Sequence, residues 1–309
     1  MMKAIGIDIG GTKIAAAAVD GAGHILARAV LPTEAPLGFE RALRRIGTAV
    51  DELLDRAGWL RSDIEGIGIG CAGPVDAAGG LINNPHTLAG WDGCDIVSPL
   101  RERFGVPVRL ENDADAAIVG ECWTGAGRGL DPVVMLTFGT GVGGAAILDR
   151  RILRGAGGQH PEIGHICVTE AGPECYCGSR GCLESLASGP AIGASASPKF
   201  KGDPARVLEA AERGDAGAAR VVDRAASASA AAAWTLFHAL LPQRLILGGG
   251  LMDGYFDRFC RAIKERLAPA TQFDQSKLSV TRAELGNNAG VIGAARLCHP
   301  SAPTSREKP

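Results

Sequence analysis

The sequence predicts an α/β protein built from two lobes that share one order of strands. At 309 residues, the chain exceeds the size at which a single hydrophobic core usually stays compact, so two lobes are expected. Hydrophobic residues make up 46% and charged residues 21% of the chain, which excludes a disordered or fibrous protein. Apolar segments, Gly-rich turns and helical patterns follow one another in an order that occurs twice. The two halves are therefore predicted to be duplicates.

The first half is predicted to begin with three strands joined by Gly-rich turns, over residues 3–8, 14–19 and 24–31. Apolar residues then recur at helical spacing over 38–57, which indicates a helix. This helix leads back to a strand over 64–70. The predicted order is three hairpin-linked strands, one helix and one further strand.

The second half is predicted to repeat this order from about residue 131. Its strands are expected at 133–138, 143–149, 151–153, 244–247 and 278–283, and its helices at 205–211, 216–241, 255–267 and 290–297. The helix over 216–241 is rich in alanine and is expected to end ahead of Pro242, because proline has no backbone N–H to donate.

The predicted fold divides into a small lobe, a large lobe and a tail. The small lobe comprises residues 1–115 and a C-terminal helix within 290–300, and the large lobe comprises 116–289. Residues 301–309 are polar and Pro-rich and are predicted to be a disordered tail.

Charge and hydropathy limit the partners and the compartment that we expect. A net charge of -2 without any run of Lys and Arg gives no support for nucleic acid or an anionic membrane as partner. Met1-Met2-Lys3 leads directly into alternating sequence, and no apolar stretch has the roughly 18 uninterrupted residues of a membrane helix. We expect a cytoplasmic protein that acts on a neutral or weakly charged small molecule.

Two Gly-rich turns, at equivalent places in the two halves, are candidates for binding ATP. Glycine lets the backbone approach a ligand and present N–H groups to phosphate oxygens. Neither turn is a Walker loop, because no Gly-x-x-x-x-Gly-Lys-[Ser/Thr] string precedes a helix. An ordinary hairpin turn is the alternative for either one alone. The predicted residues are Asp8, Gly10, Gly11, Thr12 and Lys13 in the first turn and Gly139, Thr140 and Gly141 in the second.

A third glycine run, Gly248-Gly249-Gly250, follows the predicted strand 244–247. Gly249 and Gly250 are candidates to pass under the purine ring or the ribose, where any side chain would collide. The alternative is a turn that only enters a helix.

Three carboxylates and one amide fall within residues 111–115, at the end of a predicted strand over 106–110. Carboxylates near a helix N-terminus are common, and that is the alternative to a catalytic role. Phosphoryl transfer to an alcohol needs a carboxylate that accepts the hydroxyl proton and Mg²⁺ that neutralises phosphate charge. We expect Asp113 to be the general base and Asp8 to anchor Mg²⁺ through water.

Three of the nine cysteines lie within eight positions, which is not the spacing of a disulfide framework. Cys175, Cys177 and Cys182 lie on a Gly-containing loop, and His165 stands ten positions before the first of them. Such a set is typical of tetrahedral zinc, and four protein ligands leave no open position, so the metal is predicted to be structural. Three buried free cysteines are the alternative.

These motifs together resemble the ROK family of bacterial sugar kinases and repressors. The resemblance is carried by Asp8 to Lys13, Glu111 to Ala114, Glu162-Ile163-Gly164-His165 and Cys175 to Glu184, in this order over nearly the whole chain. The Cys-x-Cys-Gly-x-x-Gly-Cys-x-Glu string after Glu-x-Gly-His is the most specific part. The resemblance implies an actin-like ATPase fold of two ribonuclease-H-like lobes around a central cleft, and a homodimer or a tetramer.

The resemblance also implies the reaction and the residues that bind its substrate. It implies transfer of the γ-phosphate of ATP to the 6-hydroxyl of a hexose, with glucose the first candidate and Asp113 taking the hydroxyl proton. The predicted sugar ligands are Asn112, Glu162, His165 and Glu184, together with Gly73, Asn83 and Asn84. Carboxylate and amide groups suit this task because each sugar hydroxyl both donates and accepts hydrogen bonds.

The sequence departs from the family pattern in two places. His160-Pro161 stands where glucose and N-acetylglucosamine kinases of the family usually have Ala-Gly, and this resembles the fructokinase branch. The three-cysteine loop and the Asn-Pro-x-x-Leu-x-Gly-Trp segment resemble the glucokinase branch instead. Asp115 stands where family members often carry Asn. Fructose, N-acetylglucosamine and N-acetylmannosamine therefore remain alternative substrates.

Two other classes of function are weighed against a kinase. Repressors of the family carry an added helix-turn-helix domain, whereas here the first predicted strand begins at Lys3 and no basic recognition helix is found. A catalytically idle sugar-binding protein would be favoured by loss of the base or of the phosphate turns, and both are present. The sequence favours an enzyme.

Overall fold

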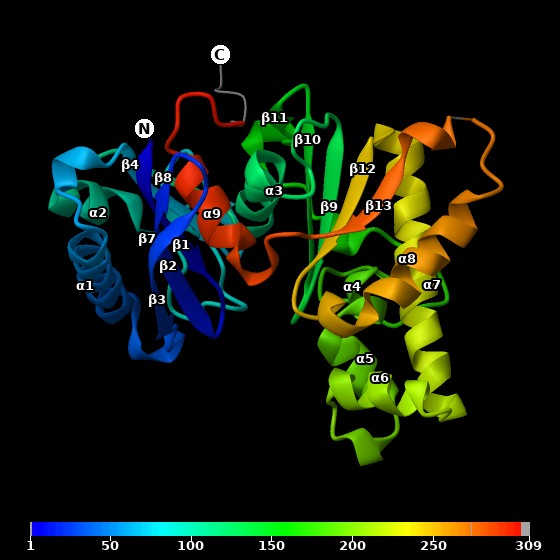
Figure 1. Ribbon diagram of the computed structural model, residues 1–309. Helices are drawn as coiled ribbons and strands as arrows, with labels where there is room; N and C mark the ends of the chain where they lie inside the picture. Colours follow the sequence, from blue (N-terminus) through cyan, green and yellow to red (C-terminus); the bar gives the residue numbers. More distant parts are fainter. Residues whose placement is uncertain (1, 273, 304–309) are drawn as a thin grey trace. The chain divides into compact units, whose positions relative to one another are not determined.

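The computed structural model describes residues 2–272 and 274–303, which divide into two compact units (Figure 1). Within the described residues, the first unit comprises 2–129, 151–160 and 287–303, and the second comprises 130–150 and 161–286.

The division between the units falls at residues 129 and 130, beyond the predicted boundary at 115. Residue 115 lies inside helix α3 (Asp113–Thr124), which packs closely against helix α9 (Ala289–Arg296). A Cβ at Gly293 of α9 would lie 1.6 Å from the backbone oxygen of Ala116, so glycine permits this close approach. Residues 304–309 of the predicted tail lie outside the described residues.

The first unit is built on a five-stranded mixed sheet with the order β3-β2-β1-β4-β8. β1 pairs antiparallel with β2 and parallel with β4, and β4 pairs parallel with β8. The strands are β1 (Lys3–Ile9), β2 (Lys13–Asp20), β3 (Ile25–Pro32), β4 (Gly66–Cys71) and β8 (Val108–Asn112).

The side chains of strand β1 point alternately to the two faces of this sheet. Ile5, Ile7 and Ile9 belong to the same hydrophobic core as the apolar face of helix α1 (Phe39–Ala57). Gly6 and Asp8 point to the other face, because successive strand residues alternate. A Cβ at Gly6 would lie 1.8 Å from a backbone oxygen of α9. The alternation therefore places Asp8 on the face that α9 covers.

A second five-stranded sheet repeats this pattern, with the order β11-β10-β9-β12-β13. Its edge strand β11 lies in the segment 151–160, which is grouped with the first unit, and its other four strands belong to the second unit. β9 pairs antiparallel with β10 and parallel with β12, and β12 pairs parallel with β13. The strands are β9 (Val133–Phe138), β10 (Val142–Leu148), β11 (Arg151–Ile152), β12 (Arg244–Gly248) and β13 (Ser279–Arg282). The predicted duplication is confirmed: the β1/β2 turn and the β9/β10 turn occupy equivalent places in the two sheets.

Helices α7 (Ala216–Leu240) and α8 (Met252–Leu267) pack together in the second unit and run side by side in Figure 1. Phe138 of β9 stacks edge-on against Phe259 of α8 with ring centroids 5.3 Å apart, which joins the sheet to the helices. Helix α6 (Pro204–Glu212) packs against α7. The predicted ends of α6, α7 and α8 agree with these bounds to within three residues.

Several short elements were not predicted. They are β5 (Val75–Asp76), β6 (Leu81–Ile82), β7 (Cys94–Asp95), α2 (Val97–Phe104), α4 (Glu184–Ala187) and α5 (Gly189–Ser195). Strands of two residues are too short to show a periodic pattern, and α4 and α5 are seven residues or fewer. Within the described part of the chain, no helix combines the length and the apolar character that crossing a membrane requires.

Candidate functional site

The first Gly-rich turn joins β1 to β2 and is closed by backbone hydrogen bonds. The N–H of Gly10 donates to the oxygen of Lys13 at 3.0 Å, and Thr33 Oγ1 donates to the oxygen of Gly10 at 2.6 Å. A Cβ at Gly11 would lie 2.4 Å from the methyl group of Thr87, so glycine lets the turn lie against the loop that holds Thr87. All five predicted residues of this turn lie on one hairpin.

Asp8 lies at the end of β1 beside the first turn of α9. A Cβ at Gly290 would lie 2.5 Å from the Asp8 carboxylate, which therefore occupies the space that a side chain at Gly290 would need. Burial and the nearby Asp113 carboxylate raise the pKa of Asp8 to about 7, although Lys13 opposes this. A cation held at Asp8 would reduce the electrostatic repulsion between the Asp8 and Asp113 carboxylates.

The second Gly-rich turn joins β9 to β10 and contacts a predicted sugar ligand. The N–H of Gly139 donates to the oxygen of Gly141 at 2.9 Å, which closes the turn. Glu184 Oε2 accepts a hydrogen bond from the N–H of Val142 at 2.8 Å, and a Cβ at Gly141 would lie 2.5 Å from the same oxygen. The turn predicted for phosphate and the carboxylate predicted for sugar are therefore directly connected.

The third glycine run follows β12 and enters α8. Gly249 has φ of 86°, and a Cβ there would lie 2.3 Å from the backbone oxygen of Phe138. Backbone packing within the second unit therefore explains why position 249 is a glycine. At Gly250, a Cβ would meet nothing within 4 Å among the described residues, so this position is open to a ligand. The roles of both glycines in binding the adenosine remain predictions.

The turn between β8 and α3 holds Asn112 and Asp113. Asn112 is the N-cap of α3, and its Oδ1 accepts a hydrogen bond from the N–H of Ala114 at 2.8 Å. Asp113 Oδ1 accepts from the same N–H at 2.8 Å. A Cβ at Gly73 would lie 2.6 Å from Asn112 Nδ2, so glycine brings the Gly73 loop to this amide. The structure brings together three of the predicted residues here.

Asp113 is half-buried, and its environment raises the pKa of its carboxyl. Burial raises the pKa of Asp113, the nearby Asp115 carboxylate raises it further, and the Ala114 N–H and the His160 ring oppose the shift. A carboxylate with a raised pKa is a stronger proton acceptor than one in free solution. The turn therefore presents a group suited to general base catalysis.

A buried ion cluster of four titratable side chains surrounds this turn: Glu111, Asp115, Arg154 and His160. The Arg154 guanidinium contacts the Glu111 carboxylate and donates to Asp115 Oδ2 at 2.8 Å. His160 Nδ1 lies 2.9 Å from the same Asp115 oxygen. The side chain of Asp115 is 0% exposed and that of Arg154 is 8% exposed. Asp115 and Glu111 outweigh the effect of burial and raise the pKa of Arg154, so its charge is retained.

Asn83 and Asn84 lie in the first unit on the loop after β6. Asn84 is 1% exposed, its Nδ2 donates to the oxygen of Ala72 at 3.0 Å, and its Oδ1 accepts from the N–H of Thr87 at 2.8 Å. These bonds hold the loop together. The side chain of Asn83 is half-buried and more accessible than that of Asn84. A sugar-binding role of either residue remains a prediction.

Glu162 and His165 lie at the two ends of one short segment of the second unit. Glu162 is exposed and precedes the 3₁₀ helix η4 (Ile163–His165), where its backbone oxygen accepts from the N–H of His165 at 2.9 Å. The His165 ring packs edge-on against Tyr176 with centroids 5.1 Å apart. Partial burial of the Tyr176 hydroxyl and its hydrogen bond to Glu184 raise the pKa of that hydroxyl. The Tyr176 side chain was not predicted as a site residue, although it lies inside the cysteine motif.

The four predicted metal ligands lie together in the second unit. One ligand atom each from His165, Cys175, Cys177 and Cys182 lies within 4.8 Å of the others. Cys175 Sγ is 3.4 Å from His165 Nδ1, and Cys177 Sγ is 3.6 Å from Cys182 Sγ. A Zn–S distance of about 2.3 Å in a tetrahedron places two sulfurs about 3.8 Å apart, so the set fits zinc.

The two closest thiols of this set differ in their surroundings. The backbone N–H of Ser179 lowers the pKa of the exposed Cys177, whereas burial raises the pKa of Cys182 to about 12. A bound metal would hold both as thiolates, because only the deprotonated sulfur is a good ligand.

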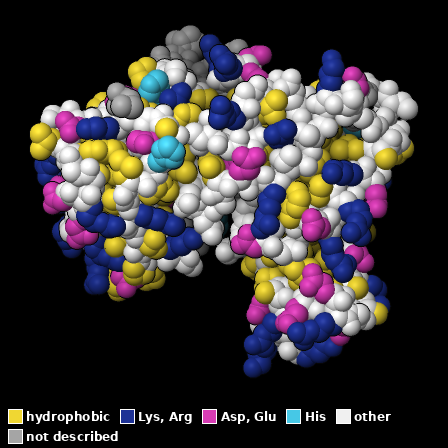
Figure 2. All heavy atoms as spheres, in the orientation of Figure 1, with side chains coloured by type: hydrophobic (Ala, Val, Ile, Leu, Met, Phe, Trp, Pro, Cys, Tyr) yellow, Lys and Arg dark blue, Asp and Glu magenta, His cyan; other side chains and the backbone are white. Residues whose placement is uncertain are grey.

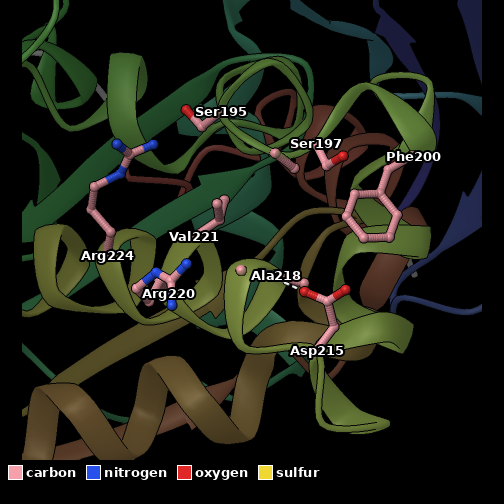
Figure 3. A pocket seen from close by; sticks show the side chains of 10 residues that line it. Ser195, Ser197, Phe200, Asp215, Ala218, Arg220, Val221 and Arg224 are labelled. Carbon is pink, nitrogen blue, oxygen red and sulfur yellow. Dashed lines mark hydrogen bonds between the residues drawn. The ribbon is translucent and has the colours of Figure 1, made fainter.

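A pocket of about 400 Å³ lies elsewhere in the second unit, between α5, the loop after it and the start of α7 (Figure 3). Ser195, Ser197, Arg220 and Arg224 are among its lining residues. None of the residues predicted for catalysis, sugar, nucleotide or metal lines it. The candidate site is therefore defined by its side chains and not by this pocket. On the face seen in Figure 2, side chains of both charge signs are intermingled.

A protein-family model described as the ROK family matches residues 4–301. The chain therefore belongs to the ROK family.

Curated relatives and solved structures match nearly the whole chain. It is 33% identical to a glucokinase of Thermotoga maritima, with 96% of this chain and 97% of the relative covered. It is 34% identical to an N-acetylmannosamine kinase of Citrobacter koseri, with 96% and 98% covered. A ROK hexokinase from Thermus thermophilus is 36% identical, with 95% and 97% covered and a TM-score of 0.83. A ROK family glucokinase from Streptomyces griseus in complex with glucose and AMPPNP is 34% identical, with 96% and 98% covered and a TM-score of 0.79. The predicted actin-like ATPase fold is confirmed by these structures.

The sequence analysis also did not predict the partners of Asp115. Arg154 was not singled out, and His160 was noted only as a departure from the family pattern. The sequence does contain a signal for this contact. Asp115 and His160 both depart from the family pattern, and one is an acid while the other is a base.

Proposed function

We propose that the chain is a hexose kinase that transfers the γ-phosphate of ATP to the 6-hydroxyl of glucose. The glucokinase relatives at 33% to 35% identity support this reaction, and each of them is matched over at least 94% of its length. The observation that carries the proposal is the half-buried Asp113 at the N-terminus of α3, adjacent to the Asn112 N-cap and with a raised pKa.

Asp113 is the proposed general base. It would accept the proton of the attacking sugar hydroxyl, which makes the oxygen a better nucleophile toward the γ-phosphate. The proton would be retained because burial and Asp115 raise the pKa of this carboxyl. The neighbouring Asn112 amide and the Gly73 backbone would orient the sugar for this transfer.

The β1/β2 and β9/β10 turns are the proposed phosphate-binding elements. Their backbone N–H groups suit phosphate oxygens, and the two turns occupy equivalent positions in their sheets. Asp8 would hold Mg²⁺ through water, and its raised pKa fits a position where a divalent cation is favoured. Mg²⁺ would neutralise the charge that develops on the phosphates. The glucokinase bound to AMPPNP supports ATP as phosphate donor.

Glu162, His165 and Glu184 are the proposed sugar ligands of the second unit. The zinc proposed at His165, Cys175, Cys177 and Cys182 would supply no catalytic group, because four protein ligands close its coordination sphere. It would hold rigid a loop that is mostly exposed and has little core of its own.

The substrate is tested by an assay of ADP release with Mg-ATP over glucose, fructose, mannose, N-acetylglucosamine and N-acetylmannosamine. Glucose is expected to give the highest kcat/KM, and NMR of the product is expected to show a 6-phosphate. Higher kcat/KM with N-acetylmannosamine would favour the activity named for relatives at 33% to 34% identity. Higher kcat/KM with fructose would link His160 to substrate choice. Turnover with none of these sugars would contradict the proposed function.

We also propose that the enzyme is a cytoplasmic homodimer. The homodimer is implied by the family resemblance and the cytoplasmic location by the hydropathy of the sequence, and light scattering of the purified protein tests the assembly. A monomeric mass would contradict it.

A further inference from the structure

The two departures from the family pattern, Asp115 and His160, are the two partners of one buried hydrogen bond. His160 Nδ1 lies 2.9 Å from Asp115 Oδ2, and the exposed fractions of the two side chains are 10% and 0%. An ionised carboxylate only accepts hydrogen bonds, so Nδ1 carries a proton in either charge state of the ring. The structure therefore explains two unusual residues by a single contact.

Asp115 belongs to the same helical turn as Asp113. Asn112 is the N-cap of α3, Asp113 is its first residue and Asp115 its third. At the third position an acid often bonds back to the start of its own helix, but Asp115 is directed to Arg154 and His160 instead. A displacement of Asp115 would therefore displace the backbone that carries Asp113.

Arg154 links both sides of this turn. Its guanidinium contacts Glu111, two residues before Asp113, and Asp115, two residues after it. The cluster thereby holds the end of β8 and the start of α3 together. Among the described residues, no donor contacts the other oxygen of Asp115, Oδ1, so its charge depends on the partners of Oδ2.

From this arrangement we propose that His160 is a positioning residue, which orients Asp113 and adjusts its charge by pairing with the buried Asp115 and with no direct contact to the substrate. For the role of Asp113 as base, the inference rests on the proposed function. The Asp115 carboxylate disfavours the negative charge of Asp113, because like charges repel. A protonated His160 favours that negative charge, because opposite charges attract. Loss of either His160 or Asp115 would leave the charge of the other uncompensated next to Asp113, the proposed proton acceptor.

Other groups also face Asp113 and must be held constant. Asp8 approaches from β1 and Cys71 from β4, and both interact electrostatically with Asp113. Asp115 lies on the same helix as Asp113, and His160 comes from the segment 151–160 of the first unit. Only the last two are altered in the test, so an effect of Asp8 or Cys71 is the same in all variants.

The test uses His160→Gln, Asp115→Asn and the double variant in the full-length protein. Gln retains a side-chain N–H donor and removes the charge of the ring, and Asn removes the charge of Asp115 at nearly constant volume. Selective ¹³C labelling of aspartate follows the titration of the Asp113 carboxyl by NMR, and the signal is assigned by its absence in Asp113→Asn. This readout needs no substrate.

His160→Gln is expected to move the titration of Asp113, and the acid limb of kcat/KM, to higher pH, because a positive neighbour is lost. Asp115→Asn is expected to move both to lower pH, because a negative neighbour is lost. The double variant is expected to lie between the two. A purely structural role of His160 would not produce shifts of opposite sign. Coincident titrations in all variants, or shifts of the same sign, would overturn the inference.

The positioning part is measured with His160→Ala, which removes the contact as well as the charge. A loss of about tenfold in kcat is expected, with an unchanged KM for ATP, since a 1 Å misplacement can cost roughly a hundredfold. His160→Gln is expected to recover most of this kcat at high pH. An unchanged kcat in His160→Ala, or a parallel change in the KM for ATP, would contradict the positioning role.

His24→Gln is the matched control, because His24 pairs with Asp20 at 3.2 Å on the surface of the same unit. It is expected to change neither the titration nor the rate. If the wild type phosphorylates no sugar, the proposed function fails while the NMR titration still decides the inference. If the wild type is active and the titrations coincide, the inference fails alone.

Discussion

The turn that holds Asp113 and the loop that holds the cysteines are stabilised by different means. The first is buried and is held by the ion cluster of Glu111, Asp115, Arg154 and His160. In the second, Cys177 is exposed, Tyr176 is 71% exposed and Cys182 alone of the three thiols is fully buried. Hydrophobic burial contributes little to such a loop. The comparison indicates that the turn of the proposed base is held by buried charges, and that the cysteine loop would be held by the four proposed metal ligands.

The largest effect is expected at the base itself. Asp113→Asn removes the proton acceptor at nearly constant shape, so kcat should fall by about 10²- to 10⁴-fold with little change in the KM for ATP. Steady-state kinetics with glucose measure it, and Asp55→Asn on the exposed side of α1 is the control. Retained turnover in Asp113→Asn would show that the buried cluster serves some other group.

Next in size is the effect of breaking the ion cluster. Arg154→Met leaves two buried carboxylates without their guanidinium, and removal of one partner of a buried pair costs roughly 3–5 kcal/mol. Urea unfolding measures the free energy. In the control, Arg213→Met breaks an exposed pair with Glu209, which should cost roughly 0–1 kcal/mol. Equal losses in the two variants would mean that burial gives the cluster no special weight.

The metal loop is tested by Cys182→Ser. Zinc is expected at about one per chain in the wild type and well below that in the variant, with a raised KM for glucose and a smaller change for ATP. Elemental analysis and kinetics measure these. Cys167→Ser is the control, because this exposed cysteine is outside the four-ligand set. A metal-loaded Cys182→Ser protein would refute the ligand set.

The smallest effect is expected at Tyr176, which joins the loop to Glu184. Tyr176→Phe removes one hydrogen bond, worth about 0.5–1.5 kcal/mol, so the KM for glucose should rise by about two- to tenfold with kcat little changed. Isothermal titration with glucose would detect the same loss as weaker binding. No change in affinity would show that the hydrogen bond from Tyr176 is not needed to orient Glu184, which also accepts from the N–H of Val142.

Most of the fold was predictable because its elements are long and periodic. The strands at both Gly-rich turns and the helices α1, α7 and α8 were placed from alternation and helical spacing. The division between the units was placed too early, at 115, because the packing of α3 on α9 joins residues about 170 apart and leaves no local pattern. The segment 151–160 belongs to the first unit for the same kind of reason.

The candidate site, too, was predictable only where its residues are close in sequence. The cysteine motif and the acidic cluster were found because their residues are close in sequence, and the four predicted metal ligands do come together. The connection of Glu184 to the second glycine turn was not foreseen, since Val142 is 42 residues away.

The sequence by itself determined the duplicated α/β order, the family, the acidic group at the start of α3 and the four candidate metal ligands. Each depends on spacing within one segment or on a motif. Only the tertiary structure decided what surrounds Asp113, because Arg154 and His160 reach Asp115 across about 40 residues. Charge acts through space, and only the fold sets the distances over which buried charges meet.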